Sequence, residues 1–170
     1  MNNAERYWKQ FTDSSSSGLS VAGRYRDSFF FGFSAEDAPE VSRLVLEGAK
    51  TATGSVLWSY EADGQTLPQV GDFWVVTKGG DDPVCVIQTT EVRILPFDEV
   101  GEEYARDGGE GDCSLGSWRE MYWEYIVSEC SRIGREPSRK APLVMERFQV
   151  VYRERLSDRL PARGLRGACS

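Results

Sequence analysis

Histidine is absent from this chain of 170 residues. Because histidine is the commonest general base in enzymes, its absence excludes every Ser-His-Asp and Cys-His mechanism. Any chemistry must use carboxylates, lysine, hydroxyl groups, tyrosine or cysteine instead. The four cysteines show no Cys-x-x-Cys spacing and have no histidine to complete a ligand set. We therefore expect free thiols, no zinc or other metal site, and no cofactor.

Basic residues are also in deficit, since 20 Lys and Arg face 27 Asp and Glu and leave a net charge of −7. Coating of nucleic acid through bulk electrostatics needs a broad basic face, so this mode is disfavoured and only a local basic cleft stays open. No apolar run is long enough to span a bilayer, and the N-terminus is polar where a signal peptide would be basic and then apolar. We expect a cytoplasmic protein without membrane association.

The length suits one domain with short extensions, since domains cluster around ~100–150 residues. Residues 1–27 combine a short amphipathic helix over 4–11 with a serine-rich connector. Residues 28–152 hold the alternating apolar patterns of the main domain. Residues 153–170 carry several arginines and little apolar content, which predicts a mobile basic tail.

Periodicity and turn residues predict the elements of the main domain. A helix is expected over 35–47, with Ser34 as its N-cap and Gly48 in the left-handed position that ends it. An acidic helix is expected over 98–105, an aromatic-striped helix begins at Leu115, and strands are expected over 51–58, 73–77, 84–95 and 143–152. This order predicts an α+β fold, a small, partly open and mostly antiparallel β-barrel with flanking helices.

The segment 48–55, Gly-Ala-Lys-Thr-Ala-Thr-Gly-Ser, holds the most suggestive side chains. Lys50 comes just after a predicted helix C-terminus, where a lysine can offset the negative helix end or serve as a functional cation. Thr51, Thr53 and Ser55 alternate along a predicted strand and so share one face. A cation and several hydroxyls on a stiff backbone could orient a carbonyl, a phosphate or a water.

Many short fragments, each weak alone, together resemble one family. The chain is similar to bacterial ASCH-domain proteins, whose fold is a PUA-like β-barrel, over roughly residues 28–152. The resemblance rests on the number and order of fragments at 31–34 (Phe-Gly-Phe-Ser), 44–53, 57–61, 67–72, 83–92, 96–100, 109–112 (Gly-Glu-Gly-Asp), 118–119 and 146–148 (Glu-Arg-Phe). The resemblance implies RNA binding in a cleft beside the barrel. Alternatively, it implies hydrolysis of N4-acylated cytidine or of RNA, and a lysine and a threonine would take part in either reaction.

Carried over by position, the lysine of the family falls on Lys50 and the threonine on Thr53. The catalytic glutamate falls on Gly108, so Glu110 is the candidate replacement if its glycine-rich loop bends toward the cleft. Ser55 stands where small hydrolytic members have arginine, and Tyr122 stands near the position of a usual histidine. The resemblance thus leaves a binding module and an enzyme open.

Further ligand contacts are predicted at aromatic and charged residues. Trp58, Trp118 and Tyr122 either stack on bases or pack in the core. Asp112 either recognises the amino edge of a base or only builds its turn. Arg119 and Arg147 either contact phosphate or pair with internal carboxylates. The preferred hypothesis is a cleft that binds RNA or a modified nucleoside; the alternatives are an amidohydrolase or ribonuclease that uses Lys50, Thr53 and Glu110, and a protein-interaction module.

Overall fold

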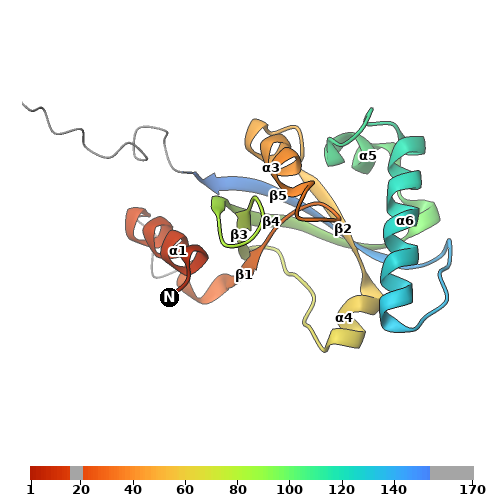
Figure 1. Ribbon diagram of the computed structural model, residues 1–170, viewed down its shortest axis with the longest axis horizontal. Coiled ribbons are helices and arrows are strands. Elements are labelled where there is room, and N and C mark those ends of the chain that lie inside the picture. The colour runs from red at the N-terminus through yellow and green to blue at the C-terminus, as the bar shows by residue number, and fades with distance from the viewer. Residues whose placement is uncertain (16–20, 154–170) are drawn as a thin grey trace, which may run out of the picture.

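A five-stranded sheet forms the centre of the computed structural model, which describes residues 1–15 and 21–153 (Figure 1). The strand order is β1-β3-β4-β5-β2. The strands are β1 (Tyr25–Phe29), β2 (Ala52–Val56), β3 (Phe73–Thr77), β4 (Pro83–Pro96) and β5 (Pro142–Tyr152). The β1–β3 pairing is parallel and the other pairings are antiparallel. The predicted α+β class with a mostly antiparallel sheet is confirmed.

The sheet of the described strands is open, so it does not close into a barrel. Among the described residues, β1 and β2 are the two edge strands and do not pair with each other. An edge strand exposes unpaired backbone groups that must be covered in another way. Here the long helix α6 (Leu115–Ile133) crosses beside β2 and covers that edge (Figure 1).

Three apolar clusters attach the helices to the sheet. Helix α6 and α5 (Glu102–Gly108) pack on β2, β4 and β5, with Ile126 fully buried among them. Helix α3 (Ala38–Glu47) packs through Val45 in a second cluster. Helix α1 (Asn3–Ser14) packs through Tyr7 and Phe11 beside Phe73 of β3. No helix within the described ranges is long and apolar enough to cross a membrane.

The predicted helix over 35–47 begins later than expected, and Ser34 is not its N-cap. Asp37 is the N-cap residue and Pro39 lies in the first turn, where its missing N–H costs nothing. The Ser34 carbonyl instead accepts from the Asp37 N–H at 3.2 Å, so residues 34–37 form a separate turn. The helix ends as predicted at Gly48, whose φ is +77°.

The predicted strand over 51–58 is too long. Strand β2 ends at Val56, and α4 (Leu57–Asp63) follows and stops at Gly64 in the left-handed conformation. Aromatic residues at the start of α4 have high strand propensity, but the segment forms a helix of about two turns that packs on α6 and β5. The predicted helix over 98–105 is a 3₁₀ turn, η2 (Phe97–Glu99), followed by α5. Strand β1, preceded by η1 (Ala22–Arg24), was not predicted.

Candidate functional site

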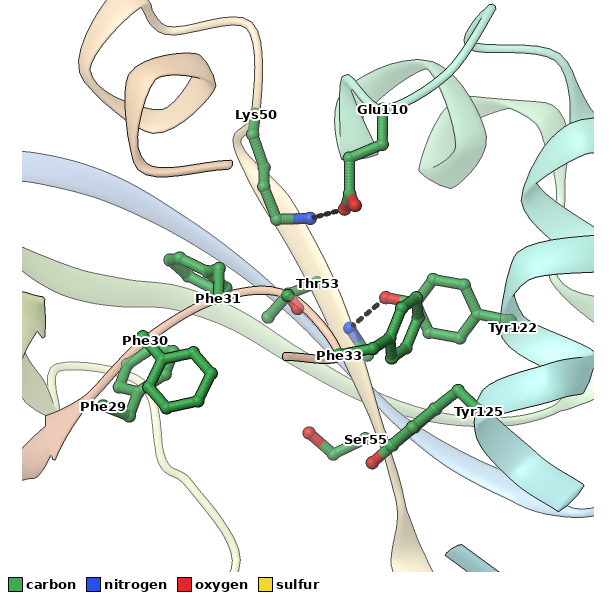
Figure 2. Close-up of a pocket in the computed structure, with 12 residues that line it drawn as sticks. Phe29, Phe30, Phe31, Phe33, Lys50, Thr53, Ser55, Glu110, Tyr122 and Tyr125 are labelled. Carbon is green, nitrogen blue, oxygen red and sulfur yellow. Dashed lines mark hydrogen bonds and ion pairs between the residues drawn. The ribbon is translucent and has the colours of Figure 1, made fainter. Parts of the chain in front are cut away.

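A cavity of about 200 Å³ lies between β2, α6 and the segment that follows β1 (Figure 2). Its polar walls are Lys50, Thr53, Ser55 and Glu110. The cavity is otherwise lined by Gly54 and by aromatic residues of the two flanking segments, namely Phe29, Phe30, Phe31, Phe33, Tyr122 and Tyr125, with Gly32 between the last two phenylalanines. The structure thus brings Lys50, Thr53, Ser55 and Glu110 together, and their roles stay predictions.

Lys50 is buried at the top of this cavity, with 2% of its surface exposed. The left-handed turn at Gly48 ends α3, and the Lys50 N–H then donates to the Leu44 carbonyl at 3.1 Å, which sets the direction of the chain. The Lys50 Nζ donates to Glu110 Oε1 at 2.7 Å and to the Gly108 carbonyl at 3.3 Å. Nζ also lies 5.4 Å from the centre of the Phe31 ring. A buried ammonium needs such partners, because an isolated charge in a low-dielectric interior is very costly.

The loop after α5 brings Glu110 to Lys50. Gly109 has φ +69°, and a Cβ there would lie 2.4 Å from the Ala49 carbonyl oxygen. Only glycine therefore allows the loop to lie against residues 49–50. Glu110 follows directly and reaches Lys50, so the bend that the sequence left open does occur. Gly108 contributes its carbonyl, and the carboxylate beside the lysine comes from Glu110.

The floor of the cavity is the edge strand β2. At Gly54 a Cβ would lie 2.7 Å from the Met145 sulfur and 3.2 Å from the Tyr122 ring, so glycine permits close approach of α6. The Gly54 N–H donates to Tyr122 Oη at 2.9 Å, and the Val56 N–H donates to Tyr125 Oη at 3.4 Å. The two tyrosines thus satisfy donors that the sheet leaves free at this edge.

Both tyrosines are neutral phenols at ordinary pH. Burial raises the pKa of Tyr122 strongly, and the nearby charge of Glu110 raises it further. Burial raises the pKa of Tyr125 to about 12. The sequence predicts stacking or core packing for Tyr122, and it indicates for Tyr125 no more than a place in the aromatic-striped helix that begins at Leu115. Their contact with β2 could not be read from helical spacing.

The aromatic wall was missed as part of the site. Phe29 packs edge-on against Phe31 with ring centres 4.7 Å apart, and Phe33 lies 5.5 Å from Tyr125. Phe33 is 54% exposed and stands at the mouth of the cavity (Figure 2). The available signal was the run Phe-Phe-Phe-Gly-Phe at 29–33, which exceeds what one buried face of a strand can use.

Three of the predicted ligand contacts, Thr51, Trp58 and Trp118, lie outside the cavity lining. Thr51 is fixed by its N–H, which donates to the Asp107 carbonyl at 2.7 Å, and it lines a different hollow beside Phe148. Trp58 lies on α4 with the Arg135 guanidinium 4.3 Å above its ring. Trp118 is buried and stacks on Tyr122 at 4.1 Å between ring centres, so it supports the wall from behind.

The remaining predicted contacts are also outside the lining. The Asp112 carboxylate accepts from the Ser114 N–H at 2.9 Å, so it builds the turn before α6. Arg119 donates to the Asp98 carbonyl at 3.4 Å. Arg147 pairs with Asp107 and lies 4.6 Å above the Tyr104 ring. In residues 1–15 and 21–153, no group of three or more Cys, Asp or Glu residues could hold a metal ion.

A second carboxyl lies across the strand pairing from the cavity floor. Glu146 on β5 is directly opposite Thr53 on β2 and is 9% exposed. Its Oε2 accepts from the Thr89 hydroxyl at 3.1 Å. Burial raises its pKa to about 7, with a further increase from the charge of Asp72. This carboxyl therefore titrates near neutrality, unlike an ordinary glutamate.

The surface next to the mouth carries several carboxylates, of which Glu40 pairs with Arg43 and Glu129 with Arg132. Two hollows adjoin the cavity at Gly32 and Phe33 and extend between α3 and α6. Apart from Glu110, their charged lining residues are Asp37, Glu40, Glu124 and Glu129, and no described lysine or arginine lines either one. A ligand that approaches the mouth from this side meets negative charge.

Comparison with known proteins defines the class to which this fold and site belong. The family model for the ASCH domain matches residues 27–152, and the chain belongs to the ASCH-domain family. The solved ASCH domain of Lactobacillus crispatus is 32% identical, with a TM-score of 0.82 over 88% of this chain and 94% of that chain. A solved protein of Enterococcus faecalis is 29% identical, with a TM-score of 0.76 over 88% of each chain. No curated protein matches. The resemblance found in the sequence is confirmed.

Proposed function

We propose that the cavity binds the base of a small uncharged nucleoside, with a modified base as the preferred ligand. Sites for drug-sized ligands occupy roughly 300–1,000 Å³, whereas this cavity measures about 200 Å³. It suits one planar ring with a small substituent, and the sugar would lie at the mouth near Phe33. An extended RNA segment would find room for no more than one of its bases.

The observation that carries this proposal is the buried Lys50–Glu110 pair, with 2.7 Å between Nζ and Oε1, inside an aromatic enclosure. Phenylalanine and tyrosine rings provide stacking surfaces for a base. The ammonium offers N–H donors and the carboxylate offers acceptor lone pairs side by side. A cytosine-type edge, with an exocyclic N–H next to ring acceptors, is complementary to such a pair.

The charge of the mouth favours a nucleoside over RNA or a nucleotide. Glu124 and Asp37 face the approach without a basic partner among the described lining residues of the two hollows. Phosphate binding draws on lysine and arginine, and the whole chain carries a net charge of −7. Arg119 and Arg147, the predicted phosphate contacts, are engaged elsewhere.

A thermal-shift screen tests the proposal, because a ligand that binds only the folded state raises the unfolding temperature. The ligands are cytidine, N4-acetylcytidine, cytidine monophosphate and a short single-stranded RNA. We expect a shift with the nucleosides that is lost in Thr53→Val and kept in Thr51→Val, the matched threonine outside the lining. A shift with RNA alone, or equal effects of the two variants, would contradict the proposal.

Hydrolysis of an N4-acylated cytidine is a second candidate function. It is favoured by one observation, that Glu110 restores a carboxylate beside Lys50 although position 108 is glycine. Glu110 would accept the proton of an attacking water that Thr53 orients, and the Lys50 ammonium would stabilise the negative charge that forms on the acyl oxygen. The C–N bond then breaks, and the proton passes to the leaving N4 amine.

The products of that reaction are cytidine and the free carboxylic acid. Chromatography of N4-acetylcytidine incubated with the protein would detect both products. Turnover that disappears in Glu110→Gln and persists in Asp112→Asn would establish the enzyme, since both carboxylates lie in the same loop and only Glu110 lines the cavity. Binding without turnover in the unmodified chain would leave the binding function and reject the hydrolase.

A further inference from the structure

The hydroxyl of Tyr122 is a polar group of the cavity with a fixed position. Its ring extends from α6 to β2, and its oxygen lies in the space below the Lys50–Glu110 pair (Figure 2). The ring stacks on Trp118 at 4.1 Å with an interplanar angle of 19°, and Tyr125 packs edge-on at 6.0 Å. These contacts hold the ring in one orientation, so the oxygen has a defined position before any ligand arrives.

The partner of this oxygen on β2 is a backbone donor. The Gly54 N–H donates to it at 2.9 Å. Burial and the nearby charge of Glu110 raise the pKa of the phenol, so the hydroxyl keeps its proton, and the Thr53 hydroxyl lowers that pKa by a smaller amount. A tyrosine hydroxyl has one proton and accepts at its oxygen lone pairs. Because β2 engages a lone pair and none of the hydrogen bonds within the described residues uses the proton, Tyr122 can donate it to a ligand in the cavity.

We propose that Tyr122 is a specificity-determining residue, whose O–H donates to a carbonyl oxygen on the substituent of the bound base. This inference rests on the proposed nucleoside-binding function and names the chemistry of the ligand more closely. The base would present its exocyclic N–H to Glu110 and an acyl oxygen to Tyr122. A substituent of equal size without an oxygen would leave the buried O–H of Tyr122 unpaired. An unpaired buried donor lowers the affinity for such a ligand strongly.

Tyr125 provides the matched control. It lines the same cavity and accepts from a β2 N–H, Val56, at 3.4 Å. Its ring, however, packs against Phe33 at the mouth, and its hydroxyl lies two residues farther along β2, beside Val56. Removing either hydroxyl takes one oxygen from the wall and one acceptor from β2, so the two variants share their structural cost.

The test is the affinity for N4-acetylcytidine and for N4-ethylcytidine, which differ in the carbonyl oxygen, measured by calorimetric titration of the unmodified chain, Tyr122→Phe and Tyr125→Phe. We expect the unmodified chain to prefer the acetyl ligand. Tyr122→Phe is expected to weaken acetyl binding about 5- to 10-fold, the equivalent of one neutral hydrogen bond, and ethyl binding much less. Tyr125→Phe is expected to keep the preference.

The outcomes separate the two proposals. If the unmodified chain binds neither nucleoside, the proposed function fails and this inference fails with it. If the chain binds and Tyr122→Phe keeps the acetyl preference, the inference alone is overturned. Should Tyr122→Phe not fold, a crystal structure of the unmodified chain with N4-acetylcytidine decides. A distance of about 2.7–3.0 Å from Tyr122 Oη to the acyl oxygen supports the inference, and an acyl oxygen beyond hydrogen-bond reach contradicts it.

Discussion

Neutralising Glu110 should destabilise the fold more than removing its partner, Lys50. In Glu110→Gln the ammonium stays buried, with 2% exposure, and keeps only the neutral Gly108 carbonyl and an amide oxygen as acceptors. Breaking a buried ion pair by removing one charge typically costs about 3–5 kcal/mol. The remaining acceptors place Glu110→Gln at the lower end, about 3 kcal/mol.

Removing Lys50 instead leaves the Glu110 carboxylate without its partner. In Lys50→Met the methylene stem is retained, and the Glu110 carboxylate, 18% exposed, can be hydrated from the mouth. We expect a loss of about 1 kcal/mol. The double variant should resemble Lys50→Met, because it leaves no unpaired charge, and the cycle should give a coupling energy of about 3 kcal/mol.

Urea denaturation followed by tryptophan fluorescence measures these differences, since the chain has five tryptophans. Asp112→Asn is the control, because Asp112 is an exposed carboxylate of the same loop that makes only its local turn contact. It should leave the unfolding midpoint nearly unchanged. Equal midpoints for Glu110→Gln and Asp112→Asn would refute the reasoning, as would a larger loss for Lys50→Met than for Glu110→Gln.

Two further predictions concern the surroundings of the cavity. The pKa of Glu146, raised to about 7, lies above its ordinary 4.5, so the folded state holds the proton longer and stability falls as pH rises between these values. The free energy of unfolding should fall by about 3 kcal/mol over this range, and Glu146→Gln should remove the fall. Stability curves of the unmodified chain and of Glu146→Gln that stay parallel from pH 4 to 8 would contradict the prediction. In the loop, Gly109→Ala should lower the free energy of unfolding by about 2 kcal/mol or more, because φ is +69° and its Cβ would meet the Ala49 carbonyl. Gly108→Ala should be tolerated, since its Cβ would meet Trp118 at an ordinary 3.7 Å, and equal losses in the two alanine variants would show that the loop does not lie against residue 49.

The parts of the fold that were predicted correctly depend on local sequence patterns, such as turn residues and helix-ending glycines. The β3–β4 hairpin follows from turn residues between two apolar runs, and the end of α3 follows from Gly48. The parallel β1–β3 pairing depends on a contact between segments about 50 residues apart, which no local pattern encodes. Helix α4 was read as strand because Leu57 and Trp58 favour pleated structure, whereas packing on α6 decides the outcome.

The candidate site divides in the same way. Lys50 and Thr53 could be chosen from the segment 48–55 and the family resemblance. Glu110 could be predicted only on the condition that its loop bends toward the cleft. Its contact with Lys50 spans 60 positions and depends on the close approach of Gly109 to Ala49. The aromatic wall and Tyr125 escaped detection, since apolar runs and helical stripes predict core packing equally well.

The central claim is that the cavity selects an uncharged nucleoside through the Lys50–Glu110 pair. Calorimetric titration of the unmodified chain with N4-acetylcytidine and with its 5′-monophosphate, at low and moderate salt, tests it most directly. The account predicts tighter binding of the nucleoside, with a difference that shrinks as salt screens the acidic mouth. Tighter binding of the monophosphate, strengthened at low salt, would contradict it.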